Sequence, residues 1–84
     1  MVVPEDIKRW IEQNLNGAWV EIDGDGQHFN AVIVYPGFAG KNRVQQHQLV
    51  YAALGERMKS EIHALSMQTL TPQEWEASTG AGDG

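Results

Sequence analysis

A helix-forming stretch between two strand-forming segments is the feature that most restricts how this 84-residue chain can fold. Apolar residues alternate over 29–35, and a further strand is predicted from about residue 62 to residue 70. Between these strands, residues at helical spacing predict a helix that loses its regularity near Gly55; they are Val44, His47, Val50, Tyr51, Leu54 and Met58. If the two strands are neighbours, a connection that contains a helix requires parallel pairing along a right-handed path.

The chain before this crossover predicts one helix and a β-hairpin. Pro4 suits the first turn of a helix, and apolar residues recur at helical spacing until Gly17, so we expect a helix over residues 4–16. Two alternating segments then flank the turn Gly24-Asp25-Gly26. This pattern is typical of two antiparallel strands, so the whole sheet should be mixed and three-stranded.

The end of the chain predicts a short helix and a tail. Thr71 and Glu74 form a capping-box pattern around a proline, so this last helix should carry Trp75. Residues 78–84 are expected to be disordered, which leaves one domain over residues 1–77. The expected fold is of the α+β class, in the order helix, strand, strand, helix, strand, helix, with the helices packed on one face of the sheet.

The composition disfavours several classes of protein. The chain has no cysteine, which argues against a disulfide scaffold and fits a reducing compartment, so we expect a cytoplasmic protein. No stretch reaches the roughly 18 apolar residues that a membrane helix needs, and the first residues lack the pattern of a signal peptide. The net charge of -5 disfavours nonspecific binding to nucleic acids. No set of serine, histidine and carboxylate predicts catalysis, so we do not expect an enzyme.

His63 opens the third predicted strand, and its imidazole has two interpretations. It shares parity with Leu65 and Met67, so it can be a hydrogen-bonded strand residue that faces the helices. It can also be a metal ligand, and because the chain lacks cysteine, the other ligands of a soft metal centre must then come from another molecule. His28, on the hairpin, is either a solvent-facing turn residue or a second ligand.

The longest break in the pattern, residues 36–43, is rich in glycine and suits a binding loop. Gly37 and Gly40 match the GXXG pattern with which KH domains hold a nucleic-acid backbone. Lys41 and Arg43 could contact phosphates there, or the acidic surface of a partner protein.

Aromatic residues and a third histidine have structural interpretations. In the alternative to a binding loop, the glycine-rich segment is a flexible turn anchored by Phe38. We expect His47 to be a buried histidine that fixes its helix against the sheet. Trp10 and Trp75 are expected in the core, and Trp19 is expected as an exposed contact because it shares its strand face with acidic residues.

Four short motifs, in this order and spacing, resemble the BolA family, whose fold is related to the second class of KH domains. They lie within residues 5–76 and are Phe38-Ala39-Gly40-Lys41, His47-Gln48-Leu49-Val50-Tyr51, Ile62-His63-Ala64-Leu65-Ser66 and Thr71-Pro72-Gln73-Glu74-Trp75. The compact turn from Gly24 to Phe29 is similar to that of the IbaG-like branch of the family.

The resemblance implies a partner and a cofactor. The partner is a monothiol glutaredoxin, with which BolA-like proteins form a heterodimer around a two-iron two-sulfur cluster. Thiolates of glutaredoxin and glutathione hold one side of the cluster, and side chains of the BolA-like protein hold the other, here His63 with His28. The free chain would then be a monomer without a cofactor, acting in iron-sulfur cluster trafficking or in iron or redox sensing. The alternative that the family implies is a DNA-binding stress-response transcriptional regulator, which would use the 37–43 loop and the second helix.

Two departures from the family pattern bear on these roles. The family commonly has Arg-His-Arg in the second helix where this chain has Gln46-His47-Gln48, and the loss of two positive charges weakens the DNA interpretation. In many relatives a cysteine or histidine of the hairpin loop is the second cluster ligand. Asp25 occupies the position of that cysteine here, and His28 is the nearest substitute.

Overall fold

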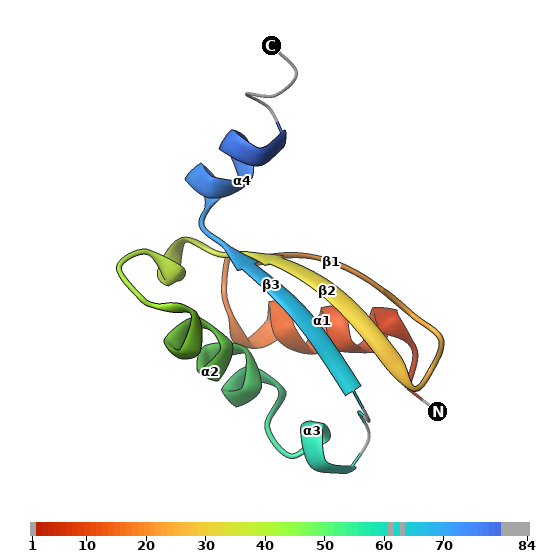
Figure 1. Ribbon diagram of the computed structural model, residues 1–84. Coiled ribbons are helices and arrows are strands. Elements are labelled where there is room, and N and C mark those ends of the chain that lie inside the picture. The colour runs from red at the N-terminus through yellow and green to blue at the C-terminus, as the bar shows by residue number, and fades with distance from the viewer. Residues whose placement is uncertain (1, 61, 63, 80–84) are drawn as a thin grey trace.

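The computed structural model describes residues 2–60, 62 and 64–79 and shows the predicted order of elements, with one short helix added after Gly55 (Figure 1). The elements are α1 (Pro4–Asn14), β1 (Trp19–Gly24), β2 (His28–Val34), a single 3-10 turn η1 (Pro36–Phe38), α2 (Arg43–Leu54), α3 (Arg57–Ser60), β3 (Ala64–Leu70) and α4 (Pro72–Thr79). In this described part of the chain, every helix is too short or too polar to cross a bilayer.

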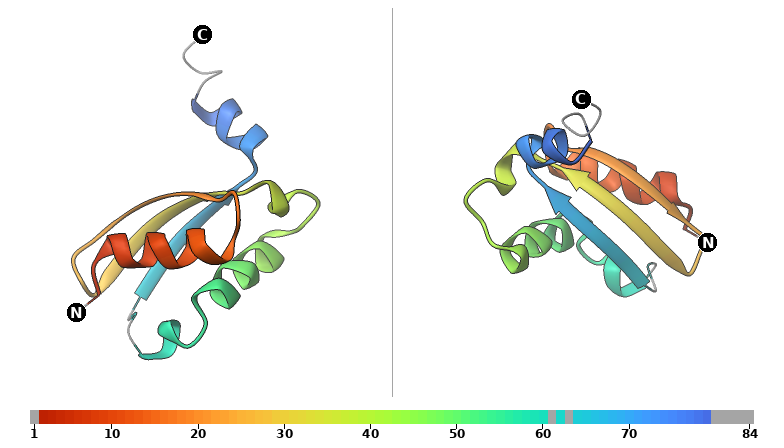
Figure 2. Two further views of the ribbon diagram at one scale, coloured as in Figure 1. Left: turned by 180° about the vertical axis from the view of Figure 1, so that it is seen from behind. Right: turned by 45° about the horizontal axis from the view of Figure 1, so that its top comes forward.

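The three strands form one mixed sheet in the order β1-β2-β3. β1 pairs with β2 antiparallel, with Ile22 opposite Ala31, and β2 pairs with β3 in parallel, with Ala31 opposite Met67. The predicted hairpin and the predicted parallel crossover are both confirmed. α1 and α2 lie against one face of the sheet, which is seen from the side of α1 in the left panel of Figure 2.

The core lies between this helix-covered face and the two long helices. Alternate strand residues point into it, and Val20, Phe29 and Ile33 are almost completely buried. Ile7 and Ile11, four residues apart on α1, are fully buried against them. The apolar alternation along the strands therefore predicted the side of the sheet that faces the helices.

α2 turns a different side to the core from the one that its apolar spacing predicts. Val44 and Tyr51 are exposed, by 64% and 41%, and His47 is only half-buried, so the predicted buried stripe is wrong at these positions. The buried residues are Gln46, Val50, Ala53 and Leu54, which are also spaced three, four and seven apart. A polar residue takes part in the buried side because Gln46 finds hydrogen-bond partners there, described below.

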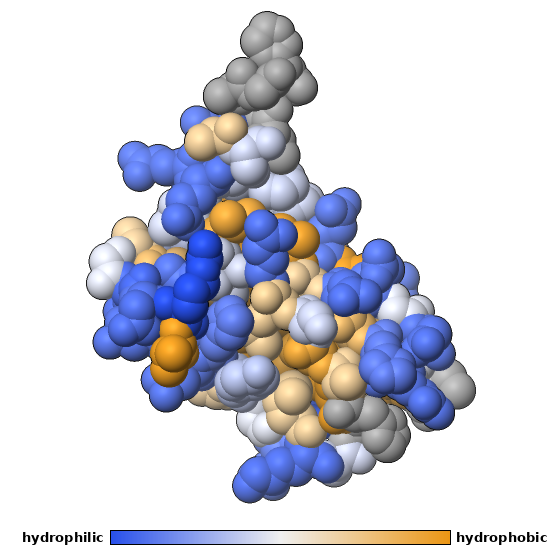
Figure 3. Space-filling model, in the orientation of Figure 1, coloured by the Kyte–Doolittle hydropathy of each residue, from blue (hydrophilic) through white to orange (hydrophobic). Residues whose placement is uncertain are grey.

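The other face of the sheet is called the open face here, and Figures 1 and 3 are viewed toward it. Register and alternation place eleven side chains on it: Trp19, Glu21, Asp23, His28, Asn30, Val32, Val34, Ala64, Ser66, Gln68 and Leu70. Hydrophobic residues gather at its centre in Figure 3, with hydrophilic ones around them. A shallow hollow crosses this face, and its charged lining residues, Glu21 and Asp23, are both acidic.

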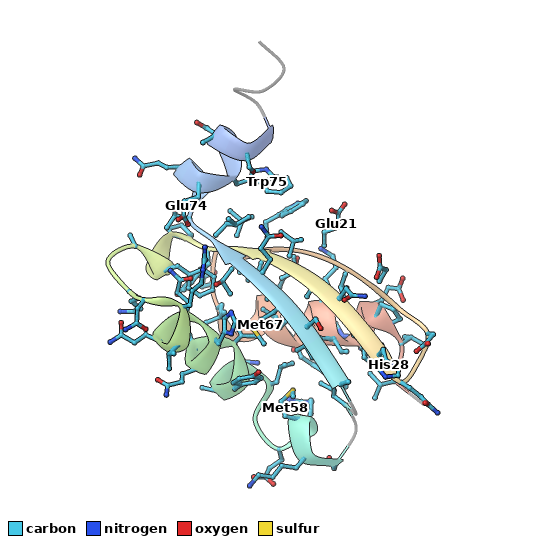
Figure 4. The ribbon with its side chains drawn as sticks, viewed as in Figure 1. Glu21, His28, Met58, Met67, Glu74 and Trp75 are labelled. Carbon is cyan, nitrogen blue, oxygen red and sulfur yellow. The ribbon has the colours of Figure 1, made fainter. Side chains whose placement is uncertain are left out.

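α4 shields one end of the open face. Trp75 lies against Trp19 with ring centroids 4.9 Å apart, and Figure 4 shows it projecting from α4 toward the end of the sheet. Beside Trp19 in the register are Val34 and Leu70, which are each only 7% exposed. The expectation that Trp75 joins the main core is therefore wrong: it is half-buried and covers a small separate apolar cluster on the opposite face.

The last helix also extends further than predicted. Its capping box forms as expected, because the Thr71 N–H donates to Glu74 Oε1 at 2.8 Å and the Glu74 N–H donates to Thr71 Oγ1 at 3.1 Å. α4 continues to Thr79, so Ser78 is helical and the predicted start of a disordered tail at residue 78 is wrong. Residues 80–84 of that predicted tail lie outside the described residues.

Candidate functional site

The hairpin turn and the start of β3 meet at one end of the sheet. His28 begins β2 and is paired in register with Ala64, the first residue of β3. The N–H of Ala64 also donates to the Gln27 carbonyl at 3.1 Å. Figure 4 shows His28 at this end, beside the start of β3. The parallel pairing therefore brings one predicted ligand, His28, next to the residue that follows the other.

His63 itself lies outside the described residues, and its predicted orientation toward the helices is not described by the structure. Both of its sequence neighbours are held in place. Ile62 is 5% exposed, and its N–H donates to the Arg57 carbonyl at 3.0 Å. Ala64, on the other side, is fixed in the β2–β3 ladder.

Asp25 builds the turn that presents His28. Its Oδ1 accepts hydrogen bonds from the backbone N–H groups of Gln27 and His28, both at 2.9 Å. Its Oδ2 lies 4.0 Å from His28 Nδ1, and both side chains are more than 70% exposed. The residue at the position of the family's cysteine is thus a turn-forming carboxylate, and the imidazole three residues later is accessible to another molecule.

Gly24 permits the tight closure of this turn. A Cβ atom at this position would lie 2.5 Å from the carbonyl oxygen of His28 and 2.5 Å from Phe29 Cδ1. Only glycine allows this approach without displacing the backbone of the proposed ligand. The glycine therefore fixes where β2 begins and where its first side chain projects.

The donor set of this end of the sheet is incomplete within the described part of the chain. No three side chains of His, Cys, Asp or Glu come together there to hold a metal ion. His28 is an exposed imidazole, a ligand type that an iron-sulfur centre accepts in place of a thiolate. Its surroundings fit a shared site in which the thiolates belong to another molecule.

The glycine-rich loop is a folded turn rather than an open clamp. Three backbone hydrogen bonds close it, from the N–H groups of Phe38, Ala39 and Lys41 to carbonyls three residues earlier. Phe38 is fully buried, which confirms that it anchors the turn. A Cβ atom on Gly37 would lie 2.4 Å from the Tyr35 ring, and Gly40 has a φ of 79°, so both glycines serve the geometry of the turn.

Gln46 joins this loop to α2 and β3 through a buried hydrogen-bond network. Its Nε2 donates to the carbonyls of Phe38 and Lys41, at 3.2 and 3.0 Å. Its Oε1 accepts from Thr69 Oγ1 at 2.6 Å and from Arg43 Nη1 at 3.2 Å. Gln46 is 5% exposed and Thr69 is fully buried, so the network holds three elements together away from water.

Arg43 takes part in the same network, which changes its predicted role. Its Nη1 also donates to the Thr69 carbonyl, so part of the guanidinium group is committed to fixing α2 against β3. Lys41 is exposed, and within the described part of the chain it has no acidic partner. In the sequence alone, Gln46 is notable only as a missing positive charge. Its spacing of four and eight residues from Val50 and Leu54 was the signal that it faces inward.

A model of the BolA-like protein family matches residues 11–74, which is most of the chain and includes the hairpin, the loop, α2 and β3. This chain belongs to the BolA family. The fold agrees, because a bolA protein homologue from Coxiella burnetii superposes with a TM-score of 0.86 at 51% identity, over 90% of this chain and 99% of that one.

Two relatives from bacteria carry different names. The acid stress protein IbaG of Escherichia coli is 42% identical over 57 residues, which cover 67% of this chain and 68% of that protein. The DNA-binding transcriptional regulator BolA of Haemophilus influenzae is 43% identical over 54 residues, 64% of this chain. This BolA-family chain matches only 52% of the length of the Haemophilus protein.

Acid should loosen the turn that presents His28. Hydrogen bonds from the backbone of His28 and Gln27 lower the pKa of Asp25 below its usual value of 3.8. Because the pKa is lower in the folded state, the stabilisation is present above the unfolded-state value and is lost as the pH falls through the folded value. We expect the amide signals of Gln27 and His28 to shift together in NMR spectra as the pH falls below 3.8, the usual value for Asp25.

The matched variants for this test are Asp25→Asn and Asp23→Asn. Asp25→Asn keeps a carbonyl acceptor for the two N–H groups but removes the titration, so its turn amides should not shift with that pH dependence. Asp23→Asn, on the neighbouring strand, should behave as the unaltered protein. An unchanged acid transition in Asp25→Asn would contradict the assignment.

Removing the buried amide should destabilise the protein and release the loop. Gln46→Ala leaves Thr69 Oγ1 and the carbonyls of Phe38 and Lys41 without their partner, at an expected cost of about 1–3 kcal/mol in the free energy of unfolding. Urea denaturation measures this cost, and amide hydrogen exchange should become faster in residues 38–41. Gln48→Ala, on the exposed side of the same helix, is the control and should change stability by less than about 0.5 kcal/mol. Equal stability of the two variants would contradict the role of the network.

Proposed function

We propose that this protein is an adaptor that binds a monothiol glutaredoxin and contributes histidine ligands, His63 with His28, to a two-iron two-sulfur cluster shared with the glutaredoxin and its glutathione. The setting proposed is cytoplasmic, in the trafficking of such clusters or in iron and redox sensing. The pairing is a heterodimer, and no catalytic role is proposed for the chain itself. Membership of the BolA family supports the partner, through the resemblance described above.

The observation that carries this proposal is the register of β2 and β3. His28 pairs with Ala64, so the exposed imidazole on the turn lies beside the residue that follows His63. Two ligands that lie 35 positions apart in the sequence are thus assigned to one end of the sheet. His28 is 74% exposed, so a partner can reach its imidazole at this end without entering the core.

The chain's own groups prepare this end of the sheet in three ways. Asp25 and Gly24 fix the turn, so that the backbone of His28 starts from a defined position. The buried Ile62 and the paired Ala64 fix the chain on either side of His63. Neutral imidazoles there accept an iron centre whose other ligands are thiolates of the partner complex, and such ligation raises the reduction potential of the cluster. The absence of cysteine from the chain makes it dependent on that partner for sulfur.

The proposal is tested by adding the protein to a glutaredoxin that carries the cluster and glutathione, and following visible absorption and circular dichroism. The unaltered protein should change both spectra, because a nitrogen ligand alters the charge-transfer bands of the cluster. His63→Ala should abolish the change, and His28→Ala should reduce it. His47→Ala is the control, because it alters a half-buried histidine of α2 that is not one of the two proposed ligands. This variant should change the spectra as the unaltered protein does.

Two outcomes would count against the proposal. One is an unchanged spectrum on addition of the unaltered protein. The other is a His63→Ala variant that gives the full spectral change while remaining folded by far-ultraviolet circular dichroism.

DNA binding is the second candidate function, and the name of the Haemophilus relative is what favours it. The structure offers it limited support. Phe38, a middle residue of the GXXG pattern, is buried and cannot contact a nucleic acid, and Arg43 is partly committed to Thr69. Lys41 is the exposed cation that remains at the loop.

We therefore expect this chain to bind duplex DNA weakly and only at low salt. A fluorescence anisotropy titration should show an affinity that falls steeply as salt is added, with a further loss in Lys41→Gln and none in Lys59→Gln. Tight binding at physiological salt that survives Lys41→Gln would favour a DNA-binding function through a different surface.

A further inference from the structure

β3 forms one edge of the sheet, and half of its backbone hydrogen-bonding groups point away from β2. The hydrogen bonds at its two ends show which half: the Ala64 N–H donates to Gln27, and the Leu70 carbonyl accepts from the Tyr35 N–H. In a parallel pair, alternate residues of a strand face the neighbouring strand. The backbone groups that face outward are therefore those of Leu65, Met67 and Thr69.

This edge lacks the usual protection against strand addition. Arg43 covers the Thr69 carbonyl, but within the described part of the chain no group bonds to the outward N–H and C=O of Leu65 and Met67. The sequence of β3, ALSMQTL, contains no charged residue and no proline, which are the side chains that commonly block an edge. The backbone of β3 is thus available to pair with another extended segment.

The opposite edge of the sheet is protected. Lys8 of α1 donates from Nζ to the Val20 carbonyl of β1 at 2.8 Å. The carboxylates of Glu21 and Asp23 follow along the same strand. A further strand can therefore be added beside β3 but not beside β1.

An exposed side of α2 lies along the open edge. Arg43, His47 and Tyr51 are spaced by four residues and share one side of the helix, and the contact of Arg43 with Thr69 turns this side toward the outer edge of β3. Figure 1 shows α2 next to β3. Tyr51 is 41% exposed and the neighbouring Val44 is 64% exposed, which is where the sequence predicted buried residues. Two large apolar side chains are thus exposed on the helix that adjoins the open edge.

Charge distinguishes this side of the molecule from the rest. Residues 41–60, which form α2, α3 and the end of the loop, contain four of the six basic residues and one of the eleven acidic residues of the chain. Lys41 and Lys59 are exposed, and Arg57 lies over the Trp10 ring at 4.5 Å from its centroid. The remainder of the chain is strongly acidic.

We propose that the edge of β3 and the adjoining side of α2 bind an extended, acidic segment of a partner protein, which joins the sheet as a fourth strand. The outward N–H and C=O groups match the two-residue repeat of a peptide strand, and Val44 and Tyr51 receive apolar side chains of that segment. Its acidic residues meet the basic residues of the 41–60 segment. A second copy of this chain fits less well, because two-fold pairing of β3 with β3 would bring two basic 41–60 segments together.

The test uses the protein without cluster or glutaredoxin, so its outcome is independent of the proposed function. The probe is a capped ten-residue peptide that alternates glutamate with valine, titrated into ¹⁵N-labelled protein. The amide signals of Leu65, Met67 and Thr69 should shift and exchange more slowly with solvent, and those of β1 should not. Binding should weaken as salt is added, and Tyr51→Ala should weaken it by about tenfold. Ala52→Ser, on the exposed side of α2 away from β3, is the matched control.

Three results would overturn the proposal. The first is the absence of any shift at the β3 amides up to about 1 mM peptide. The second is equal binding of a peptide in which lysine replaces glutamate, or binding of a ten-nucleotide oligothymidine at this edge in place of the acidic peptide. The third is concentration-dependent protection of the same amides in the protein alone, with a dimer detected by sedimentation, which would assign the edge to a second copy of the chain.

Discussion

The parallel pairing of β2 with β3 is the constraint on which the rest of this structure depends. Because the two strands run in the same direction, the chain must return from one end of the sheet to the other, and α2 and α3 occupy that return. The same pairing sets His28 beside Ala64 at one end and Val34 beside Leu70 at the other. The first end carries the proposed cluster ligands. The second carries the small apolar cluster that Trp75 and α4 shield.

A buried amide holds the returning helix in place. Gln46 links the carbonyls of the glycine-rich loop to Thr69 of β3, and Arg43 adds a second link to the same residue. The network fixes α2 next to β3 at the edge of the sheet, with Val44 and Tyr51 exposed on the helix. Where the family commonly has a positive charge, this chain has Gln46, a buried amide that hydrogen-bonds the loop to β3. The absence of that charge favours a protein partner over a nucleic acid.

Much of the fold could be predicted because its signals are local. The Gly24-Asp25-Gly26 turn, the capping box at Thr71 and the strand alternation each depend on a few adjacent residues, and the structure confirms them. The exposed side of α2 could not be predicted in this way, because two apolar spacings are present and the hydrogen bonds of Gln46 select between them. The location of Trp75 depended on a pairing with Trp19, 56 positions earlier, which no local pattern contains. At the candidate site, the sequence offered His28 as a candidate ligand but did not show that the carboxylate of Asp25 shapes its turn.

The proposed function requires that a nitrogen atom of this chain coordinates an iron atom held jointly with a partner. Pulsed electron paramagnetic resonance tests it most directly, on the reduced cluster of the glutaredoxin complex with the histidines of this protein labelled with ¹⁵N. We expect a ¹⁵N hyperfine coupling of the size typical of a directly bound imidazole, lost in His63→Ala and retained in His47→Ala. Spectra without such a coupling in the unaltered complex, or the same coupling in His63→Ala, would contradict it.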